Sequence, residues 1–513
     1  MKDKLILLIV FTQILVNLAV AQDLGTGISN HSIVKRFDGK LFTWGWNYFG
    51  QLGNGQNTNR NNPVSVDTNG VLSGKTIITV AVGAAHSLAL SSDGMVYSWG
   101  ANLYGGLGIG NNIDINVPVA VYTGGVLSGK SIIKISAGSG HSIVVASDGT
   151  VYTWGQNTYG ELGNGTSGSN AWKNLPVAVD MNGVLNGKFI TQVAGGQNHS
   201  IALASDGTVY TWGNNGFGQL GDGSNINSSV PVAVNTSGVL SGKTVVQVAA
   251  GYYHSLALTS DGNIYSWGRN DYGQLGNENT GTNRNLPVAV STSGLLNGKT
   301  ITKIAAGAFH NLVLTSDGEL YTWGFNEYGQ LGNGNTGTNS NIPVAVSTSG
   351  VMNGKSLTQL GTGFDHCLAL ASDGTLFSWG NNTYGELGNG NNTHSNVPVQ
   401  VNQSVIGLLP VDELSPTLFS YELSQNYPNP FNPSTRISWQ SPVGSHQTLK
   451  VYDILGNVIA TLVDEYKPAG SYEVEFNVAQ SASADRPELA SGIYFYRLTA
   501  GTFVETKKMI LIR

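Results

Sequence analysis

The chain has 513 residues and a net charge of −6, and only 11% of its residues are charged, against about 25% in a typical globular protein. The net negative charge argues against a nucleic-acid-binding protein, which would carry a basic patch. The single cysteine, Cys367, excludes an intramolecular disulfide, and we expect it to be a small buried residue.

The first 21 residues have the pattern of a secretory signal peptide. Lys2 and Lys4 precede an apolar stretch at residues 5–20, and residues 19–21 match the small-x-small cleavage pattern. The alternative is an anchoring helix, but the stretch of about 16 residues contains polar side chains and is shorter than the about 20 residues that span a bilayer. We therefore predict that residues 1–21 are removed, and we expect no transmembrane segment in the mature chain.

Seven histidines recur at steps of 55, 55, 58, 55, 56 and 56 residues, and each is followed 13 residues later by a Trp-Gly pair. A fixed step of this size indicates one supersecondary unit copied seven times. The histidines are His31, His86, His141, His199, His254, His310 and His366, and the tryptophans are Trp44, Trp99, Trp154, Trp212, Trp267, Trp323 and Trp379.

Each unit can be divided into four strands. In the second unit we expect strand a at residues 77–82, strand b at 86–90, strand c at 96–99 and strand d at 118–121. Asp93-Gly94 supplies the positive φ of a tight turn between b and c. A proline opens strand d in every unit, which is typical of an edge strand.

Four antiparallel strands repeated seven times predict a seven-bladed β-propeller over residues 22–403. A blade cannot bury its apolar face alone, so we expect the seven tryptophans to pack between neighbouring blades. The first unit has only residues 22–30 before His31, and Asp23 to Gly27 resembles a short strand a. We expect the ring to close by strand sharing, with one terminal segment paired to the other terminal blade.

Residues 31–401 resemble the regulator of chromosome condensation repeat family, through the repeated Ser-Asp-Gly, Trp-Gly-x-Asn-x-Tyr-Gly-x-Leu-Gly and Pro-Val segments. The resemblance implies a seven-bladed propeller. It implies little about function, because the family includes a guanine-nucleotide exchange factor as well as unrelated activities.

The pattern breaks after the last unit. Residues 404–423 read as a linker, and residues 424–513 alternate apolar and polar side chains, which predicts a small all-β sandwich, Ig-like in class. The segments 426–434, 449–456, 469–476, 489–497 and 506–513 resemble the C-terminal sorting domain of the type IX secretion system, although residues 480–489 look longer than usual. This resemblance implies a bacterial protein that is exported, engages the secretion machinery through residues 424–513, and is either released or held at the outer cell surface.

The repeated histidines suggest metal or acid–base chemistry, but a catalytic site brings different residues to one place, whereas this histidine occurs once in every unit. We expect each histidine to bond the neighbouring backbone near the a–b turn. The loop at residues 333–341 offers oxygens to calcium but lacks carboxylates. We therefore predict no metal, no cofactor and no catalytic residue.

Residues that differ between units are better candidates for recognition. The a–b turn and the loop after Trp-Gly should share one rim, and aromatic and arginine side chains dominate interface energetics. The alternative is that these rings only plug the mouth of the funnel. The candidate binding residues are Trp46, Tyr48, Tyr252, Tyr253, Arg269, Asp271, Phe309, Phe325, Glu327, Phe364 and Asp365.

The sequence thus favours a non-enzymatic, monomeric, secreted or cell-surface protein that binds an extracellular protein or glycan. One alternative is a propeller enzyme acting on an extracellular polysaccharide, for which Asp271, Glu327 and Asp365 are the only carboxylate candidates. A second is guanine-nucleotide exchange by family analogy, although the even spacing leaves little room for an inserted wedge. A third is a purely architectural surface protein.

Overall fold

The computed structural model describes residues 23–25, 27–36, 38–406, 422–441, 445–467, 470–478, 489–500 and 503–512. The chain forms two compact units, one spanning residues 21–411 and the other including residues 412–513. The predicted signal peptide and residues 480–488 lie outside the described residues. Among those described, no helix has the length and hydropathy to cross a membrane.

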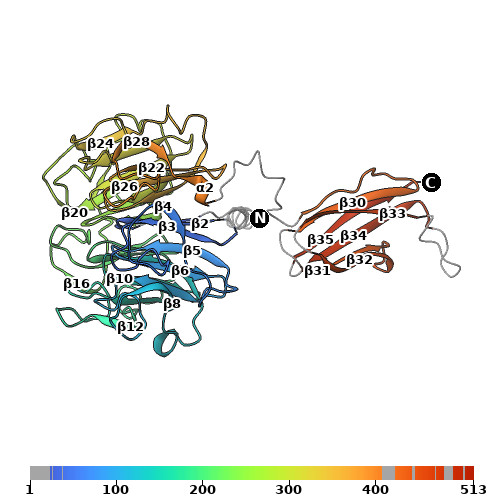
Figure 1. Cartoon of the computed structure of the whole chain (residues 1–513), viewed down its shortest axis with the longest axis horizontal. Helices are drawn as coiled ribbons and strands as arrows, with labels where there is room; N and C mark the ends of the chain where they lie inside the picture. Colours follow the sequence, from blue (N-terminus) through green and yellow to red (C-terminus); the bar gives the residue numbers. More distant parts are fainter. Residues whose placement is uncertain are drawn as a thin grey trace. The chain divides into compact units, whose positions relative to one another are not determined.

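The first unit consists of seven four-stranded antiparallel sheets, each built from four consecutive strands (Figure 1). This confirms the seven-bladed propeller. The strands are β1 Asp23–Leu24, β2 His31–Lys35, β3 Leu41–Gly45, β4 Arg60–Ser65; β5 Ile77–Val82, β6 His86–Ser91, β7 Val96–Gly100, β8 Ile115–Ala120; β9 Ile132–Ala137, β10 His141–Ala146, β11 Val151–Gly155, β12 Lys173–Ala178; β13 Ile190–Gly195, β14 His199–Ala204, β15 Val209–Gly213, β16 Ser228–Ala233; β17 Val245–Ala250, β18 His254–Thr259, β19 Ile264–Gly268, β20 Arg284–Ala289; β21 Ile301–Ala306, β22 His310–Thr315, β23 Leu320–Gly324, β24 Ser340–Ala345; and β25 Leu357–Thr362, β26 His366–Ala371, β27 Leu376–Gly380, β28 Ser395–Gln400.

The tight turn between the second and third strands forms as predicted. Gly94 has a φ of +80°, and its N–H donates to the Ser91 carbonyl over 2.9 Å. Glycine adopts this conformation without the steric penalty that a Cβ would impose. The turn brings β6 and β7 into register, with Ser87 opposite Trp99.

The fourth strand of each blade begins earlier than predicted. Pro118 was expected to open this strand, but β8 starts at Ile115, so the proline stands fourth. The pairing of β7 with β8 shifts register between Ser98 and Gly100. Since proline cannot donate to the ladder, it is accommodated at this irregularity on an edge strand.

The ring closes without strand sharing, so that prediction was wrong. The short β1 pairs with β2 of its own blade, which confirms that residues 23–24 act as the first strand a. The last blade likewise contains only its own four strands. Strand β1 contacts both β5 and β25, and Figure 1 shows the last blade, in orange, beside the blue first blade. After β28, a short helix α2 at Gln403–Ile406 contacts β4 of the first blade.

The propeller core is divided among the contacts between neighbouring blades. All seven repeat tryptophans are fully buried. Trp99 of the second blade packs with Ile33 and Leu41 of the first, and Trp44 of the first blade packs with Leu368 and Leu376 of the seventh. Each indole, about 150–250 Å² of surface, is buried only because the neighbouring blade covers it.

The second unit is the predicted small β-sandwich. A three-stranded sheet has the order β29-β30-β33 and a four-stranded sheet the order β32-β31-β34-β35, and one core cluster draws side chains from both. The strands are β29 Glu422–Leu423, β30 Ser434–Ser441, β31 Ser445–Tyr452, β32 Val458–Lys467, β33 Gly470–Asn477, β34 Gly492–Ala500 and β35 Phe503–Leu511.

Candidate functional site: the aromatic rim of the propeller

The repeat histidines join neighbouring blades by side-chain hydrogen bonds. His31 Nε2 lies 2.8 Å from Ser87 Oγ of the next blade, and the Ser87 hydroxyl donates to the Gln51 carbonyl over 2.9 Å. The same carbonyl accepts the Trp99 indole N–H, also at 2.9 Å. We call this set of three hydrogen bonds a seam. The expectation that each histidine bonds the neighbouring backbone was therefore wrong, because the next blade offers a closer hydroxyl.

An equivalent seam occurs at all seven blade junctions, with two changes of acceptor. Asn311 Oδ1 lies 2.8 Å from His254 Nε2, and Cys367 Sγ lies 3.2 Å from His310 Nε2. The other histidine contacts are His86–Ser142, His141–Ser200, His199–Ser255 and His366–Ser32. The last of these joins the seventh blade to the first.

The seam fixes the protonation of the histidines. Because the single hydroxyl proton of Ser87 is donated to a carbonyl, His31 must donate from Nε2 and leave Nδ1 as a bare acceptor. Burial lowers the pKa of His31 to about 3, so the ring is neutral. These histidines are structural groups, because each uses its Nε2 atom to bond the next blade.

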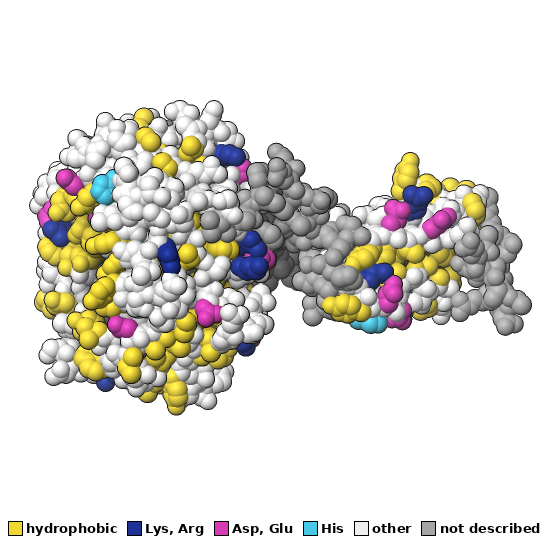
Figure 2. Space-filling view, in the orientation of Figure 1, with side chains coloured by type: hydrophobic (Ala, Val, Ile, Leu, Met, Phe, Trp, Pro, Cys, Tyr) yellow, Lys and Arg dark blue, Asp and Glu magenta, His cyan; other side chains and the backbone are white. Residues whose placement is uncertain are grey.

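The a–b turns and the loops after Trp-Gly meet on one rim, as predicted. The N–H of Arg269, in the loop after β19, donates to the carbonyl of Tyr253, in the turn before β18, over 2.9 Å. The same bond joins Phe325 to Phe309 in the sixth blade, again at 2.9 Å. On the face in Figure 2, hydrophobic side chains gather in patches and charged ones are scattered.

Blades four to seven bring aromatic side chains together around one arginine. We call this set the aromatic cluster, and its rings are all partly buried. The Arg269 guanidinium carbon lies 5.1 Å from the ring centre of Phe217 and 5.2 Å from that of Phe309. Cations at this distance are attracted to the negative face of an aromatic ring. The members are Phe217, Tyr252, Tyr253, Arg269, Tyr272, Phe309, Phe325 and Phe364.

Tyr252, in the fifth blade, contacts both neighbouring blades and also the seventh blade. Its ring centre lies 5.2 Å from that of Phe309 in the sixth blade and 5.2 Å from that of Phe364 in the seventh. Its hydroxyl also accepts a hydrogen bond from Gln197 of the fourth blade. Burial raises the pKa of Tyr252, so the phenol stays neutral. The cluster therefore joins loops of blades four to seven while leaving a share of each ring exposed.

Trp46 and Tyr48 belong to a separate group at the junction of the first and seventh blades. The Trp46 ring centre lies 5.5 Å from that of Phe49 and 6.0 Å from that of Tyr384. Tyr48 packs edge-on against Phe49 but is 68% exposed, the largest exposure among the candidate aromatic residues that were predicted. No ring contact in the described residues joins this group to the aromatic cluster.

The three candidate carboxylates have different environments. Asp271 forms an ion pair with Arg269, with Oδ2 2.6 Å from Nε, and Glu327 is exposed. Asp365 is buried and accepts a hydrogen bond from Gln330 over 3.3 Å, and burial raises its pKa to about 7. In the described part of the chain no hydrogen bond or ion pair joins the three, and no group of three potential metal ligands is found there.

The sequence reasoning missed Phe217 and Tyr272. Both occupy a position five residues after the repeat tryptophan, where every blade carries a tyrosine or phenylalanine. Because the position is aromatic in every blade, the sequence indicates a structural role for it and not a role in recognition. Phe217 lies in the blade before that of Arg269, so the sequence of one repeat does not indicate that the two side chains are in contact. The only signal is that both belong to loops on the same rim.

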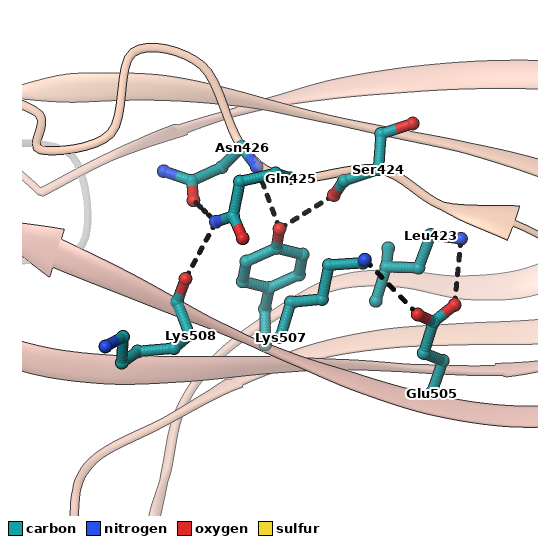
Figure 3. Close-up of polar contacts among 8 residues, drawn as sticks. Leu423, Ser424, Gln425, Asn426, Glu505, Lys507 and Lys508 are labelled. Atoms are coloured by element: carbon teal, nitrogen blue, oxygen red, sulfur yellow. Dashed lines mark hydrogen bonds and ion pairs between the residues drawn. The ribbon is translucent and has the colours of Figure 1, made fainter.

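The second unit holds residues 423–426 by polar contacts with its last two strands, β34 and β35 (Figure 3). The Tyr496 hydroxyl donates to the Ser424 carbonyl over 2.7 Å and accepts the Asn426 N–H over 2.8 Å. Glu505 accepts the Leu423 N–H and forms an ion pair with Lys507. These bonds make residues 423–426 an integral part of the sandwich.

Sequence comparisons match both units to known families. Residues 123–408 match the RCC1-like domain, and residues 38–90 and 93–145 match the regulator of chromosome condensation (RCC1) repeat. Residues 425–512 match the secretion system C-terminal sorting domain.

The chain is 33% identical over 415 residues to the ultraviolet-B receptor UVR8 of Arabidopsis thaliana, covering 81% of this chain and 86% of that protein. It is 35% identical to the human E3 ubiquitin-protein ligase HERC2 over 65% of this chain but only 6% of that protein. Human WBSCR16 superposes with a TM-score of 0.63 at 26% identity, covering 71% of this chain and 94% of that one. Yeast RCC1 (Prp20), solved with Kap60, gives 0.60 at 25% identity, covering 75% and 85%.

Proposed function

We propose that this chain, which belongs to the RCC1-like domain family and carries a type IX secretion sorting domain, is an exported, non-enzymatic binding protein. Its aromatic rim captures an extracellular protein or glycan. Export and an outer-surface or extracellular location follow from the sorting domain. The binding role rests on the rim.

The uneven distribution of rim side chains carries this proposal. The turn before β6 contains Ala84 and Ala85, and the turn before β10 contains Ser139 and Gly140, whereas the turn before β18 contains Tyr252 and Tyr253. Packing between blades does not require this difference, because the repeat histidine and tryptophan bond neighbouring blades at the junctions beside either kind of turn. Partly exposed tyrosine, phenylalanine and arginine are the residue types that anchor partners.

Alanine substitution of the rim tests the proposal. We expect Trp46→Ala, Tyr252→Ala and Phe325→Ala each to weaken partner capture by at least about ten-fold, as loss of an interface anchor does, while the melting temperature changes by no more than about 2 °C. Capture uses the mature exported protein as bait against the proteins of its native surroundings and against a glycan array, which separates the two classes of partner.

Tyr104→Ala is the matched control, because Tyr104 is an exposed rim tyrosine of the second blade that lies outside the aromatic cluster. It should leave capture unchanged. A large thermal loss in the three variants, with capture no weaker than that of the control, would show that the rings only plug the funnel.

A further inference from the structure

One position in the loop before the outermost strand departs from the repeat in the fifth blade. Six blades have glycine there, and the fifth has Glu278. Glu278 has a φ of +67° and is the only non-glycine residue with positive φ among the described residues. The glycines are Gly55, Gly110, Gly165, Gly223, Gly334 and Gly390, with φ between +76° and +89°.

The backbone conformation at this position is imposed by the neighbouring blade. The Glu278 N–H donates to the Asn341 carbonyl over 3.0 Å, and the Gly334 N–H makes the equivalent bond to Asn396 over 2.9 Å. The equivalent bond occurs in every blade, so the φ of Glu278 cannot become negative without breaking the hydrogen bond to the Asn341 carbonyl. A side chain here is therefore strained, and strained residues concentrate at functional sites.

The Glu278 side chain forms one wall of a cleft between the loop that follows β20 in blade five and the outermost strand β24 of blade six. Its Oε1 accepts hydrogen bonds from Ser291 over 2.6 Å and from Ser293 over 3.0 Å. The cleft has a volume of about 290 Å³, and Leu295 and Ile342 line it with exposed apolar surface.

The charge of this carboxylate is not balanced within the described residues. The two serine hydroxyls hold the pKa of Glu278 below its usual value, so it is ionised at neutral pH. No ion pair with a lysine or arginine of the described chain involves Glu278. An anionic group beside apolar walls is complementary to a cation carried on an apolar stem.

We propose that the cleft formed by Glu278, Ser291, Ser293, Leu295, Ile342 and Pro343 binds a lysine side chain of a polypeptide partner. The ammonium group pairs with the Glu278 carboxylate, and the methylene stem lies along Leu295 and Ile342. The site uses no residue of the aromatic cluster and is a second recognition point on the propeller.

Titration of the mature protein with Nα-acetyl-lysine methylamide, followed by NMR, tests this site directly. We expect saturable binding that weakens with added salt, and no binding of the analogue that is also acetylated on Nε. Glu278→Gln keeps the strain and removes the charge, so it should weaken binding by about ten-fold without changing the melting temperature.

Glu278→Gly separates strain from charge. It should abolish binding while raising the melting temperature by about 1–2 °C, because glycine adopts positive φ without penalty. A merely structural glutamate would instead destabilise the protein when it is removed. Phe309→Ala, in the aromatic cluster, should leave lysine binding intact, so failure of the rim proposal and failure of this one are distinguishable.

The sixth blade offers a gain-of-function control. Ser347, Thr348 and Ser349 repeat the sequence of residues 291–293, and a Cβ added at Gly334 would meet no atom within 4 Å. Gly334→Glu in the Glu278→Gly background should restore lysine binding and lower the melting temperature. The proposal is overturned if wild-type protein does not bind the probe, or if Glu278→Gln and Glu278→Gly bind it as wild type does.

Discussion

Two of the seven seams differ from the others at a single residue. Five blades place a serine after the repeat histidine, whereas the sixth has Asn311 and the seventh has Cys367. Asn311 preserves the pattern, since its amide accepts from His254 and donates to the Gln274 carbonyl. Cys367 does so poorly, because its sulfur lies 3.5 Å from the Gln330 carbonyl and a thiol is a weak donor.

Cys367→Ser should therefore stabilise the propeller. A hydroxyl restores the hydrogen bonds found in five other seams, and we expect the free energy of unfolding to rise by about 0.5–1.5 kcal/mol. Urea unfolding of the two proteins measures this. Because burial raises the pKa of the Cys367 thiol far above its usual value, alkylation should proceed only as fast as the protein unfolds. A less stable serine variant would show that the sulfur is held by packing alone.

At the level of strands and blades, the junction between the seventh and first blades is equivalent to the other six. The Trp44 indole N–H donates to the Glu386 carbonyl over 2.7 Å, as that of Trp212 donates to the Glu161 carbonyl over 2.7 Å. The Phe364 N–H also donates to the Ser29 carbonyl over 2.7 Å. These bonds replace the strand sharing that closure was expected to need.

Trp44→Phe and Trp212→Phe should therefore cost the same. Each removes one indole hydrogen bond and leaves a small cavity, and we expect each to lower the free energy of unfolding by about 2–3 kcal/mol. Thermal and urea unfolding of both variants give the comparison. If closure were the weak point of the ring, Trp44→Phe would cost clearly less than Trp212→Phe, because Trp44 would already be partly released.

The repeat pattern was sufficient to predict the number of blades, the strands and the buried tryptophans, since a fixed step forces identical packing. It was insufficient for the contacts between units. The partner of His31 is Ser87, 56 residues away, and nothing within one repeat indicates which side of the blade a ring faces. Pro118 misled the prediction for the fourth strand, because a register shift accommodates it inside the strand.

The candidate site was predicted in part. The variable turns correctly located Tyr252, Phe309 and Phe364 on one rim. Asp365 is a departure, since it is buried rather than displayed, and the short local sequence could not reveal that Gln330 of the preceding blade covers it. Glu278 could not be singled out from residue type alone, because what distinguishes it is a positive φ at a position where the other six blades have glycine.

At the scale of the whole molecule, seven buried histidines make the propeller sensitive to acid. Burial lowers the pKa of four of them to about 3 and of three to about 4, from 6.5. Between pH 6.5 and pH 3 the histidines of the unfolded chain bind protons that those of the folded chain do not. The stability that depends on the neutral histidines is therefore fully present above pH 6.5 and is lost as the pH decreases. Asp365 and Glu386, whose pKa values burial raises to about 7, act in the opposite direction and offset part of the loss.

We therefore expect the free energy of unfolding to fall by about 5–7 kcal/mol per pH unit between pH 6 and pH 5, the slope for about five net protons, and the propeller to unfold between about pH 6 and pH 4. Urea unfolding at a series of pH values gives the slope and hence the number of protons taken up. A slope near zero between pH 7 and pH 5 would mean that the histidines are accessible to water and that the seams are not formed.

The most direct test of seven equivalent seams is hydrogen exchange of the ten indole N–H groups, measured by NMR on the exported protein. The seven repeat tryptophans are fully buried and hydrogen-bonded, and Trp439 donates to Gln447 in the second unit, whereas Trp46 and Trp172 are partly exposed. We predict slow exchange for all seven repeat indoles, with Trp44 as slow as the other six, and fast exchange for Trp46 and Trp172. Fast exchange of Trp44 alone would show that the ring is open between the seventh and first blades, and fast exchange of several repeat indoles would contradict the seams altogether.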